Sequence, residues 1–390
     1  MKNINILTFG ADAQASNMGC MALGRSFIAL CEAIAKRNQW KIHLVMLSEG
    51  RVSYSTEWIT VETIVGQFRK VDFYRRLNKH IKESDLIVDF TLGDSFTDIY
   101  GLSRFVTGTI PKYMAVHQKK KFVMGPQTIG PFNNPIIRAV AKNILKKTDL
   151  LYCRDELSSK YAEKVLGKNN ILTTDVAFSL QPDFDSVKTN VFSDRTKIGI
   201  NVSELLWYLR RNKSDHVFLK MNYREYTSRL IEYCLKNHLE VHLISHVINE
   251  HIGSPDDYTA AEELKKQYPQ VIIAPRFTDP MQAKAYISKM DCFIGARMHA
   301  TIGAVSMNVP TIPIAYSRKF TGLYKLLDYN HVIDATRVDT ETALIATYQK
   351  LDSLDCMKGQ VKQAVVKAMQ LNQEFMMGLE SLLESQIQST

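Results

Sequence analysis

The sequence predicts an α/β protein built from two doubly wound parallel sheets, and three observations support this. Short apolar runs rich in β-branched residues alternate with longer segments of helical period, which is the pattern of parallel α/β units. The runs fall into two sets along 390 residues, a length that suits two domains. A polar stretch at 181–195, with three aspartates and a proline, separates the sets. We expect the two sheets to face each other across a cleft that binds ligands at the carboxyl edges of the strands.

The predicted strands are short, between three and six residues, and their Val, Ile and aromatic content favours strand over helix. The first set opens with Ile-Asn-Ile-Leu-Thr-Phe and comprises 4–9, 43–47, 85–90, 121–124, 150–153 and 171–173. The second set comprises 197–202, 240–245, 271–274, 292–295 and 311–315. The tail has helical period and little Gly or Pro, so we expect helices that fold back toward the first domain. The predicted divisions are 1–185 for the first Rossmann-like domain, 196–340 for the second and 341–390 for the helical tail.

The composition excludes a disordered or fibrous chain, because 45% of the residues are hydrophobic and 23% are charged. Lys and Arg number 49 against 40 Asp and Glu, which gives a net charge of +9. This balance favours an anionic substrate, an anionic membrane surface or nucleic acid. Nucleic acid is not expected, since the basic residues are not interleaved with stacking aromatics and no helix-turn-helix or RNA-binding pattern occurs.

The cysteines and the apolar segments point to a cytoplasmic protein. The six cysteines lie far apart without a Cys-x-x-Cys pair, as expected for reduced thiols. The first residues form too short an apolar run for a secretory signal and are followed by no cleavage site. The longest nearly uncharged stretch, 298–316, contains His299, Asn308 and two prolines, so it fails as a membrane span. Any membrane contact is therefore expected to be peripheral, at the inner face.

The densest functional signal is Gly295-Ala-Arg-Met-His, which follows a predicted strand. Arg297 and His299 would stand at the N-terminus of a helix, where backbone N–H groups and the helix dipole favour an anion. Lys319, after the next strand, adds an ammonium group, so the three side chains suit a phosphate together with a carboxylate. The alternative is that Arg297 pairs with a structural carboxylate and His299 is a hydrogen-bonded core residue. The strand edge and Lys319 favour the binding interpretation.

Two further strand ends carry candidate residues in the first domain. Arg154 follows a predicted strand and would face the cleft, while Asp155 or Ser158 near the next helix start also suits simple capping with a salt bridge. The loop Gly125-Pro-Gln-Thr-Ile-Gly-Pro is stiff and lets a ligand approach the backbone closely, although an ordinary turn is the alternative.

Metal and nucleotide sites have little support. His246 follows a predicted strand and could line the cleft with Asp256 and Asp257, but its spacing to Glu250 and His251 lacks the His-Glu-x-x-His pattern, so we expect no metal. Neither the Gly-x-Gly-x-x-Gly nor the Walker pattern occurs, which argues against nicotinamide and Walker-type nucleotides.

With these motifs in order, the chain resembles the polysaccharide pyruvyl transferase family over nearly its whole length. The matching pieces are Asn17-Met-Gly, Gly93-Asp-Ser-Phe, Gly125-Pro-Gln-Thr-Ile-Gly-Pro-Phe, Arg154-Asp-Glu, Asp175-Val-Ala-Phe, His246 with Asp256-Asp257, Gly295-Ala-Arg-Met-His-Ala, and Val309-Pro through Tyr316-Ser-Arg-Lys. Their order and spacing together are specific. One departure stands out: many members carry Gly-Asp after the early Asn, whereas Gly19 is followed here by Cys20.

The resemblance implies a glycosyltransferase-B-like fold and the transfer of pyruvate from phosphoenolpyruvate to a sugar as a ketal. It places the donor at Arg154, Arg297, His299 and Lys319, and the wider set of expected substrate-binding residues adds Asn17, Gly125, Gln127, His246 and Met298. Two arginines and a lysine would neutralise both ends of phosphoenolpyruvate, so no cofactor or metal is expected beyond this donor substrate. His299 is the predicted general acid or phosphate stabiliser. Asp94 and Asp155 are candidates for the base only because they follow strand ends.

Acceptors in this family are often polyprenyl-diphosphate-linked or polymer-bound sugars, so basic surface would bring the enzyme to the anionic cytoplasmic leaflet. Evenly solvated lysines, as at 119–121, are an equal alternative. Two other functions stay open: a nucleotide-sugar-dependent glycosyltransferase of the same two-domain fold, and a non-catalytic glycan-binding protein.

Overall fold

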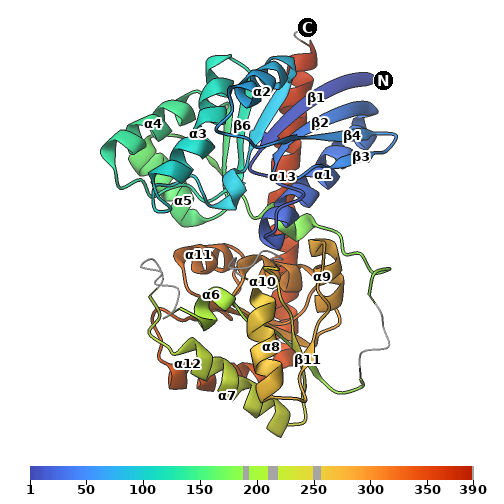
Figure 1. Ribbon diagram of the computed structural model, residues 1–390, viewed down its shortest axis with the longest axis vertical. Coiled ribbons are helices and arrows are strands. Elements are labelled where there is room, and N and C mark those ends of the chain that lie inside the picture. Colours follow the sequence, from blue (N-terminus) through green and yellow to red (C-terminus); the bar gives the residue numbers. More distant parts are fainter. Residues whose placement is uncertain (188–192, 210–217, 249–255, 389–390) are drawn as a thin grey trace. The chain divides into compact units, whose positions relative to one another are not determined.

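The computed structural model describes the chain except residues 188–192, 210–217, 249–255 and 389–390 (Figure 1). The residues divide into two compact units. Unit 1 comprises Met1–Ala15, Cys20–Leu180 and Ala368–Thr390, and unit 2 comprises Ser16–Gly19 and Gln181–Lys367. The short segment Ser16–Gly19 thus belongs with unit 2 although its neighbours on both sides belong to unit 1, a feature that no sequence pattern indicated.

The described part of unit 1 contains an eight-stranded sheet in the order β3-β4-β2-β1-β5-β6-β7-β8. The strands are β1 (Lys2–Phe9), β2 (Trp40–Ser48), β3 (Ser53–Ser55), β4 (Ile59–Val65), β5 (Leu86–Asp89), β6 (Lys121–Gln127), β7 (Leu150–Cys153) and β8 (Ile171–Leu172). All neighbours pair in parallel except β3, which is antiparallel to β4. Strands β2, β4 and β3 lie on one side of β1, and β5 to β8 lie on the other side. The strand order therefore reverses between β1 and β5.

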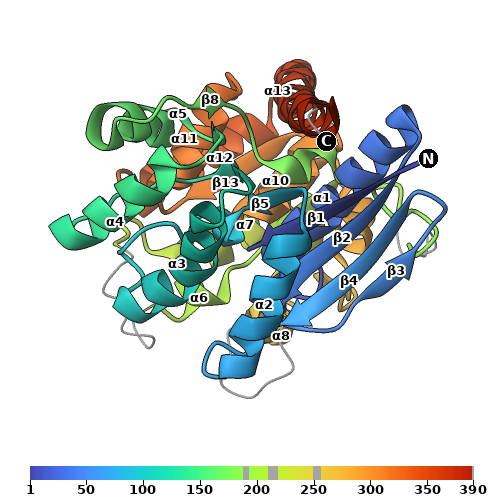
Figure 2. The ribbon, with the colours of Figure 1, turned by 90° about the horizontal axis from the view of Figure 1, so that it is seen from above.

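Helices cover both faces of this sheet because successive strand residues point to opposite sides (Figure 2). Ile6 packs in one cluster with α1 (Met18–Asn38) and the C-terminal part of α13 (Leu354–Gln388), whereas Leu7 packs in the other with α2 (Val71–Glu83), α3 (Leu102–His117) and α4 (Pro135–Lys146). The shorter helical elements of unit 1 are η1 (Thr91–Gly93), α5 (Glu156–Tyr161), η2 (Ala162–Leu166) and η3 (Val176–Ser179).

Among the described residues, α1 is the one helix that is long and apolar enough to cross a membrane by length and composition. Its side chains Leu23, Phe27 and Cys31 are fully buried in the cluster on the sheet. Burial of this face inside the unit is what a core helix requires, so the apolar composition of α1 is explained by packing.

The described part of unit 2 contains a six-stranded parallel sheet in the order β11-β10-β9-β12-β13-β14. Its strands are β9 (Lys197–Asn201), β10 (Glu240–Leu243), β11 (Ile272–Ile273), β12 (Cys292–Gly295), β13 (Thr311–Ala315) and β14 (Ile333–Asp334). Its helices are α6 (Glu204–Trp207), α7 (Tyr223–Lys236), α8 (Asp257–Gln267), α9 (Pro280–Ile287), α10 (Met298–Ser306), α11 (Arg318–Leu326), α12 (Thr340–Leu351) and the start of α13. The α7, α8 and α12 helices pack on one face and α9 and α10 on the other, so this unit is also doubly wound.

The predicted fold class of two Rossmann-like α/β units is confirmed. The sequence patterns missed β3, β4 and β14. In β4 the buried residues Ile59 and Val61 alternate with the exposed Thr60 and Glu62, so the strand has no continuous apolar run that would mark it. The β14 strand has only two residues and adds to the sheet edge. The expected cleft between the sheets stays a prediction.

Candidate functional site

The candidate site of unit 2 lies at the junction between β12 and α10. Arg297 is the residue before the first turn of α10, and its backbone N–H donates to the side-chain oxygen of Asn201, 2.9 Å away. Asn201 ends the neighbouring strand β9, and its side-chain amide donates to the carbonyl of Ile244 just beyond β10. One asparagine therefore ties together the carboxyl ends of β9, β10 and β12.

The guanidinium of Arg297 forms an ion pair with Asp257, the first residue of α8. Nη2 lies 2.7 Å from Oδ1, and Nε lies 3.2 Å from both carboxylate oxygens. Asp257 is fully buried and also accepts the backbone N–H groups of Glu204 and Val247, at 2.9 and 3.0 Å. Burial opposes the charge on Arg297, but Asp257 outweighs it and the pKa of Arg297 is raised above its ordinary value. The alternative considered from the sequence, a structural carboxylate partner for Arg297, therefore exists.

This pairing limits what Arg297 can offer a ligand. Within the described chain, Nη1 donates no hydrogen bond, so one nitrogen of the fork is available while Asp257 offsets the positive charge. The side chain keeps 14% of its surface exposed. The site is consequently less cationic than the sequence alone suggested.

His246 lies beside this pair, after β10, with 4% of its surface exposed. Neither ring nitrogen has a hydrogen-bond partner among the described residues. Burial, and then the neighbouring His299, lower the pKa of His246 to about 3, so its imidazole is neutral at physiological pH. Buried polar groups in proteins are nearly always hydrogen bonded, so an unpaired imidazole here marks a place where a polar ligand group fits.

His299 sits in the first turn of α10 and is contacted by the segment Ser16–Gly19. Asn17 forms an isolated antiparallel bridge with Val247, and its side-chain oxygen accepts the N–H of Gly19 at 2.8 Å. Gly19 faces the imidazole so closely that a Cβ at this position would overlap the His299 ring. The structure thus brings Asn17, Gly19, His246 and His299 together within unit 2. Met298, beside His299, is 5% exposed and belongs to the core of the junction.

Lys319 is the second residue of α11 and is half-buried. It follows β13, whose Pro313 pairs with Gly295 of β12. Because neighbouring parallel strands end at the same sheet edge, Arg297 and Lys319 begin two adjacent helices there. Two helix N-termini at one edge favour a bound anion.

The predicted site residues of unit 1 are engaged in contacts within the unit. Arg154 is 2% exposed; its Nη1 lies 2.5 Å from Asp175, and its Nε donates to Thr128 at 3.1 Å. Asp155 accepts from the N–H and hydroxyl of Ser158 at 2.8 and 2.7 Å, so it caps α5 as the alternative interpretation proposed. With Asp155 engaged in capping, Asp94 is the more accessible of the two base candidates.

Asp94 is half-buried and accepts a hydrogen bond from the hydroxyl of Tyr100 at 3.0 Å. Burial, and then the charge of Asp94, raise the pKa of the Cys20 thiol to about 12. Gly125 and Gln127 lie inside β6: Gly125 packs on the ring of Phe90, and the amide of Gln127 donates to the carbonyl of Asp89 at 2.8 Å. Both of these residues support the centre of the sheet.

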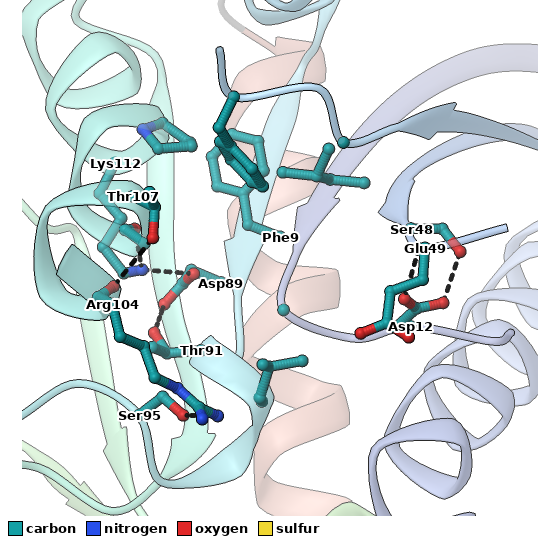
Figure 3. A pocket seen from close by; sticks show the side chains of 17 residues that line it. Phe9, Asp12, Ser48, Glu49, Asp89, Thr91, Ser95, Arg104, Thr107 and Lys112 are labelled. Atoms are coloured by element: carbon teal, nitrogen blue, oxygen red, sulfur yellow. Dashed lines mark hydrogen bonds and ion pairs between the residues drawn. The ribbon is translucent and has the colours of Figure 1, made fainter. Parts of the chain in front are cut away.

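A cavity of about 230 Å³ opens in unit 1 where the strand order reverses, at the carboxyl ends of β1, β2, β4 and β5 (Figure 3). It is lined by Phe9, Gly10, Asp12, Leu47, Ser48, Glu49, Gly66, Phe68, Asp89, Thr91, Leu92, Ser95, Arg104, Thr107, Gly108, Pro111 and Lys112. Reversal of strand order is where open α/β sheets bind their ligands. We call this cavity the unit 1 pocket.

The unit 1 pocket has charged groups on two sides (Figure 3). On one side the buried Lys112 lies 3.0 Å from Asp89, and Arg104 donates to the hydroxyl of Ser95 at 2.8 Å. On the other side Asp12 accepts the N–H of Glu49 at 2.6 Å. Sequence reasoning missed these lining residues, because Lys112 and Arg104 are scattered on a helix and no local motif marks them.

Within the described chain, no group of three or more His, Cys, Asp or Glu side chains is arranged to hold a metal ion. Glu250 and His251, considered above as ligands with His246, lie outside the described residues.

Comparison with known proteins identifies one matching family model, that of polysaccharide pyruvyl transferase, over residues 37–318. No curated protein matches the sequence. Similar solved structures include sucrose-phosphate synthase from Thermosynechococcus elongatus, with a TM-score of 0.63, 12% identity and full coverage of both chains. A trehalose 6-phosphate synthase from Burkholderia multivorans has a TM-score of 0.59 and 8% identity, also over both full chains. UDP-GlcNAc 2-epimerase from Neisseria meningitidis, bound to UDP-GlcNAc, has a TM-score of 0.57 and 9% identity over 97% of this chain and 100% of its own. At these identities the likeness concerns the fold, which is that of glycosyltransferase-B proteins.

Proposed function

Because the chain belongs to the polysaccharide pyruvyl transferase family, we propose that it transfers pyruvate from phosphoenolpyruvate to a sugar of a cell-surface polysaccharide or its lipid-linked precursor. The product is a pyruvate ketal, and phosphate is released. The observation that carries the proposal is the junction after β12, where Arg297 and His299 begin one helix, Lys319 begins the next, and the unpaired imidazole of His246 lies beside them.

Phosphoenolpyruvate has a phosphate and a carboxylate a few bonds apart. These two anions would meet positive groups at the junction, namely Nη1 of Arg297, the ammonium of Lys319 and the first N–H groups of α10 and α11. The neutral imidazole of His246 adds a hydrogen-bonding group without adding charge. The role of Arg154 in donor binding rests on the resemblance, because this arginine belongs to unit 1 and is paired with Asp175. The donor is a substrate, and no cofactor enters the scheme.

In the proposed reaction, His299 donates a proton to the methylene carbon of phosphoenolpyruvate while a sugar hydroxyl adds at C2 and gives its proton to a base. The C2–O bond to phosphate then breaks, and the departing phosphate takes the proton from the base. A second hydroxyl of the same sugar adds at C2 and loses its proton, which closes the ketal and restores the acid.

The acceptor sugar fits the unit 1 pocket. Its volume of about 230 Å³ suits one sugar ring, with Arg104 to meet a hydroxyl and the ring of Phe9 as an apolar wall. Asp94 is the proposed base. It lies close enough to position 20 to raise the pKa of the Cys20 thiol, and position 20 is where many family members carry an aspartate. We propose that Asp94 supplies the carboxylate that those family members carry at position 20, where this chain has Cys20.

The test is phosphate release from phosphoenolpyruvate by the purified protein, with and without galactosyl, glucosyl and mannosyl acceptors, water-soluble and lipid-linked. We expect release only with an acceptor of the right sugar, together with incorporation of pyruvate into that acceptor. If calorimetry shows no phosphoenolpyruvate binding while a nucleotide sugar binds, the glycosyltransferase alternative replaces the proposal. Binding of a glycan without turnover would instead support a non-catalytic glycan-binding protein.

Substitution Gly19→Ala is expected to reduce turnover about 100-fold, because the new Cβ displaces the His299 ring and misplaced catalytic groups lose about this factor. Donor affinity should change much less, since Arg297 and Lys319 are not touched. The matched control is Gly303→Ala on α10, where the nearest atom to an added Cβ is Ile287 at 4.0 Å. Wild-type turnover in Gly19→Ala would show that the contact does not position His299.

A further inference from the structure

The α3 helix separates two different surfaces of unit 1. One face lines the unit 1 pocket through Arg104, Gly108 and Lys112. The opposite face forms, with α4, a groove of about 340 Å³ whose lining residues are apolar apart from the hydroxyls of Thr109 and Tyr113. The groove residues are Leu102, Phe105, Val106, Thr109, Ile110, Tyr113, Met114, Ile136, Ile137 and Val140. We call this surface the α3–α4 face.

Several large apolar side chains on the α3–α4 face are exposed. Ile136 at the start of α4 keeps 75% of its surface exposed, Leu102 at the start of α3 keeps 63%, and Tyr113 and Val106 keep 49% and 42%. Scattered exposed apolar residues are ordinary on proteins, but a continuous groove ringed by them marks an interaction site.

The same stretch of chain is strongly basic. Residues 99–148 contain no Asp or Glu and nine cations, namely Arg104, Lys112, Lys119, Lys120, Lys121, Arg138, Lys142, Lys146 and Lys147. Lys112 is buried with Asp89, and Lys121 pairs with Asp149 just beyond the stretch. The other cations are exposed or half-buried on or beside α3 and α4. Two of these cations lie at one end of the groove. Lys147 is 2.7 Å from a ring nitrogen of His117, whose ring contacts Tyr113, and Lys119 lines the same surface hollow as Lys147 and His117.

We propose that the α3–α4 face docks on the surface of an anionic lipid bilayer. Exposed apolar side chains such as Leu102 and Ile136 enter the boundary between headgroups and acyl chains, while Lys119 and Lys147 meet anionic headgroups. A second copy of this chain is a poorer occupant, because residues 99–148 of its own face contain no Asp or Glu to match these cations.

The inference rests on the proposed function and explains how the enzyme reaches a lipid-linked sugar. A helix with its side chains is about 10–12 Å across. The unit 1 pocket, on the other side of α3, therefore lies about one helix diameter from the docked face.

The test is sedimentation of the full-length protein with vesicles of phosphatidylcholine alone or with 30 mol% phosphatidylglycerol. We expect binding to the anionic vesicles that weakens with added salt. The double variant Leu102→Asn with Ile136→Asn should bind at least tenfold more weakly. Substitution of both Lys119 and Lys147 by glutamine should weaken binding about fivefold for each charge removed. The matched control is Ile345→Asn with Val366→Asn, two apolar residues exposed to 55% and 58% on α12 and α13, which should bind like wild type.

Equal binding by wild type and the Leu102/Ile136 variant, or equal binding to neutral and anionic vesicles, would overturn the proposal. Sedimentation velocity without lipid tests whether a second copy of the chain occupies the face. A dimer that the Leu102/Ile136 variant abolishes would assign the face to that second copy. Transferase assays separate this inference from the proposed function. The Leu102/Ile136 variant should keep wild-type turnover on a water-soluble acceptor and lose it on a vesicle-embedded one. A protein that binds vesicles through this face but transfers no pyruvate would refute the proposed function alone.

Discussion

Arg297→Ala is expected to lower the free energy of unfolding of unit 2 by about 3–5 kcal/mol, because it leaves the fully buried carboxylate of Asp257 without its cation. Urea unfolding followed by the fluorescence of Trp207, the tryptophan of unit 2, measures this loss. Arg276→Ala is the matched control. Arg276 pairs with the adjacent Asp256 at 3.0 Å but is 44% exposed, so its loss should cost less than about 1 kcal/mol.

Loss of activity in Arg297→Ala does not by itself show that Arg297 binds the donor, since the variant loses both a donor contact and a structural ion pair. Arg297→Lys keeps a positive charge beside Asp257 but removes the planar fork and with it Nη1. We expect it to retain most of the stability and to bind phosphoenolpyruvate more weakly. If Arg297→Ala unfolds at the same urea concentration as wild type, the ion pair with Asp257 does not stabilise unit 2.

His299→Gln is expected to reduce turnover by about 10²–10⁴, the range for loss of a general acid, because an amide of similar size cannot transfer the proton. Saturating phosphoenolpyruvate and acceptor in the phosphate-release assay measure the rate, and calorimetry measures donor affinity, which should fall much less. His43→Gln, at an exposed histidine that contacts Glu62 in unit 1, is the control and should leave turnover unchanged. Full activity of His299→Gln would assign the acid to another group.

The fold was largely predictable because its signals are local. Buried strands such as β5 and β12 are short apolar runs, and the strand-to-helix junction at Gly295–Arg297 is visible from the change of period. The β4 strand escaped because half of its residues face solvent. The order and spacing of the motifs identified the family, whose model matches residues 37–318.

The candidate site was predictable only in its residue types and its place on the sheet edge. The sequence by itself determined that Arg297, His299 and Lys319 follow parallel strands, because strand ends are set by local pattern. Only the tertiary structure decided that Asp257, forty positions earlier than Arg297, takes up most of its guanidinium, and that Gly19 packs on His299. It also decided that one side of α3 lines a polar pocket and the other an apolar groove. Such contacts join residues far apart in the chain, and their energies depend on burial and distance, which no local pattern contains.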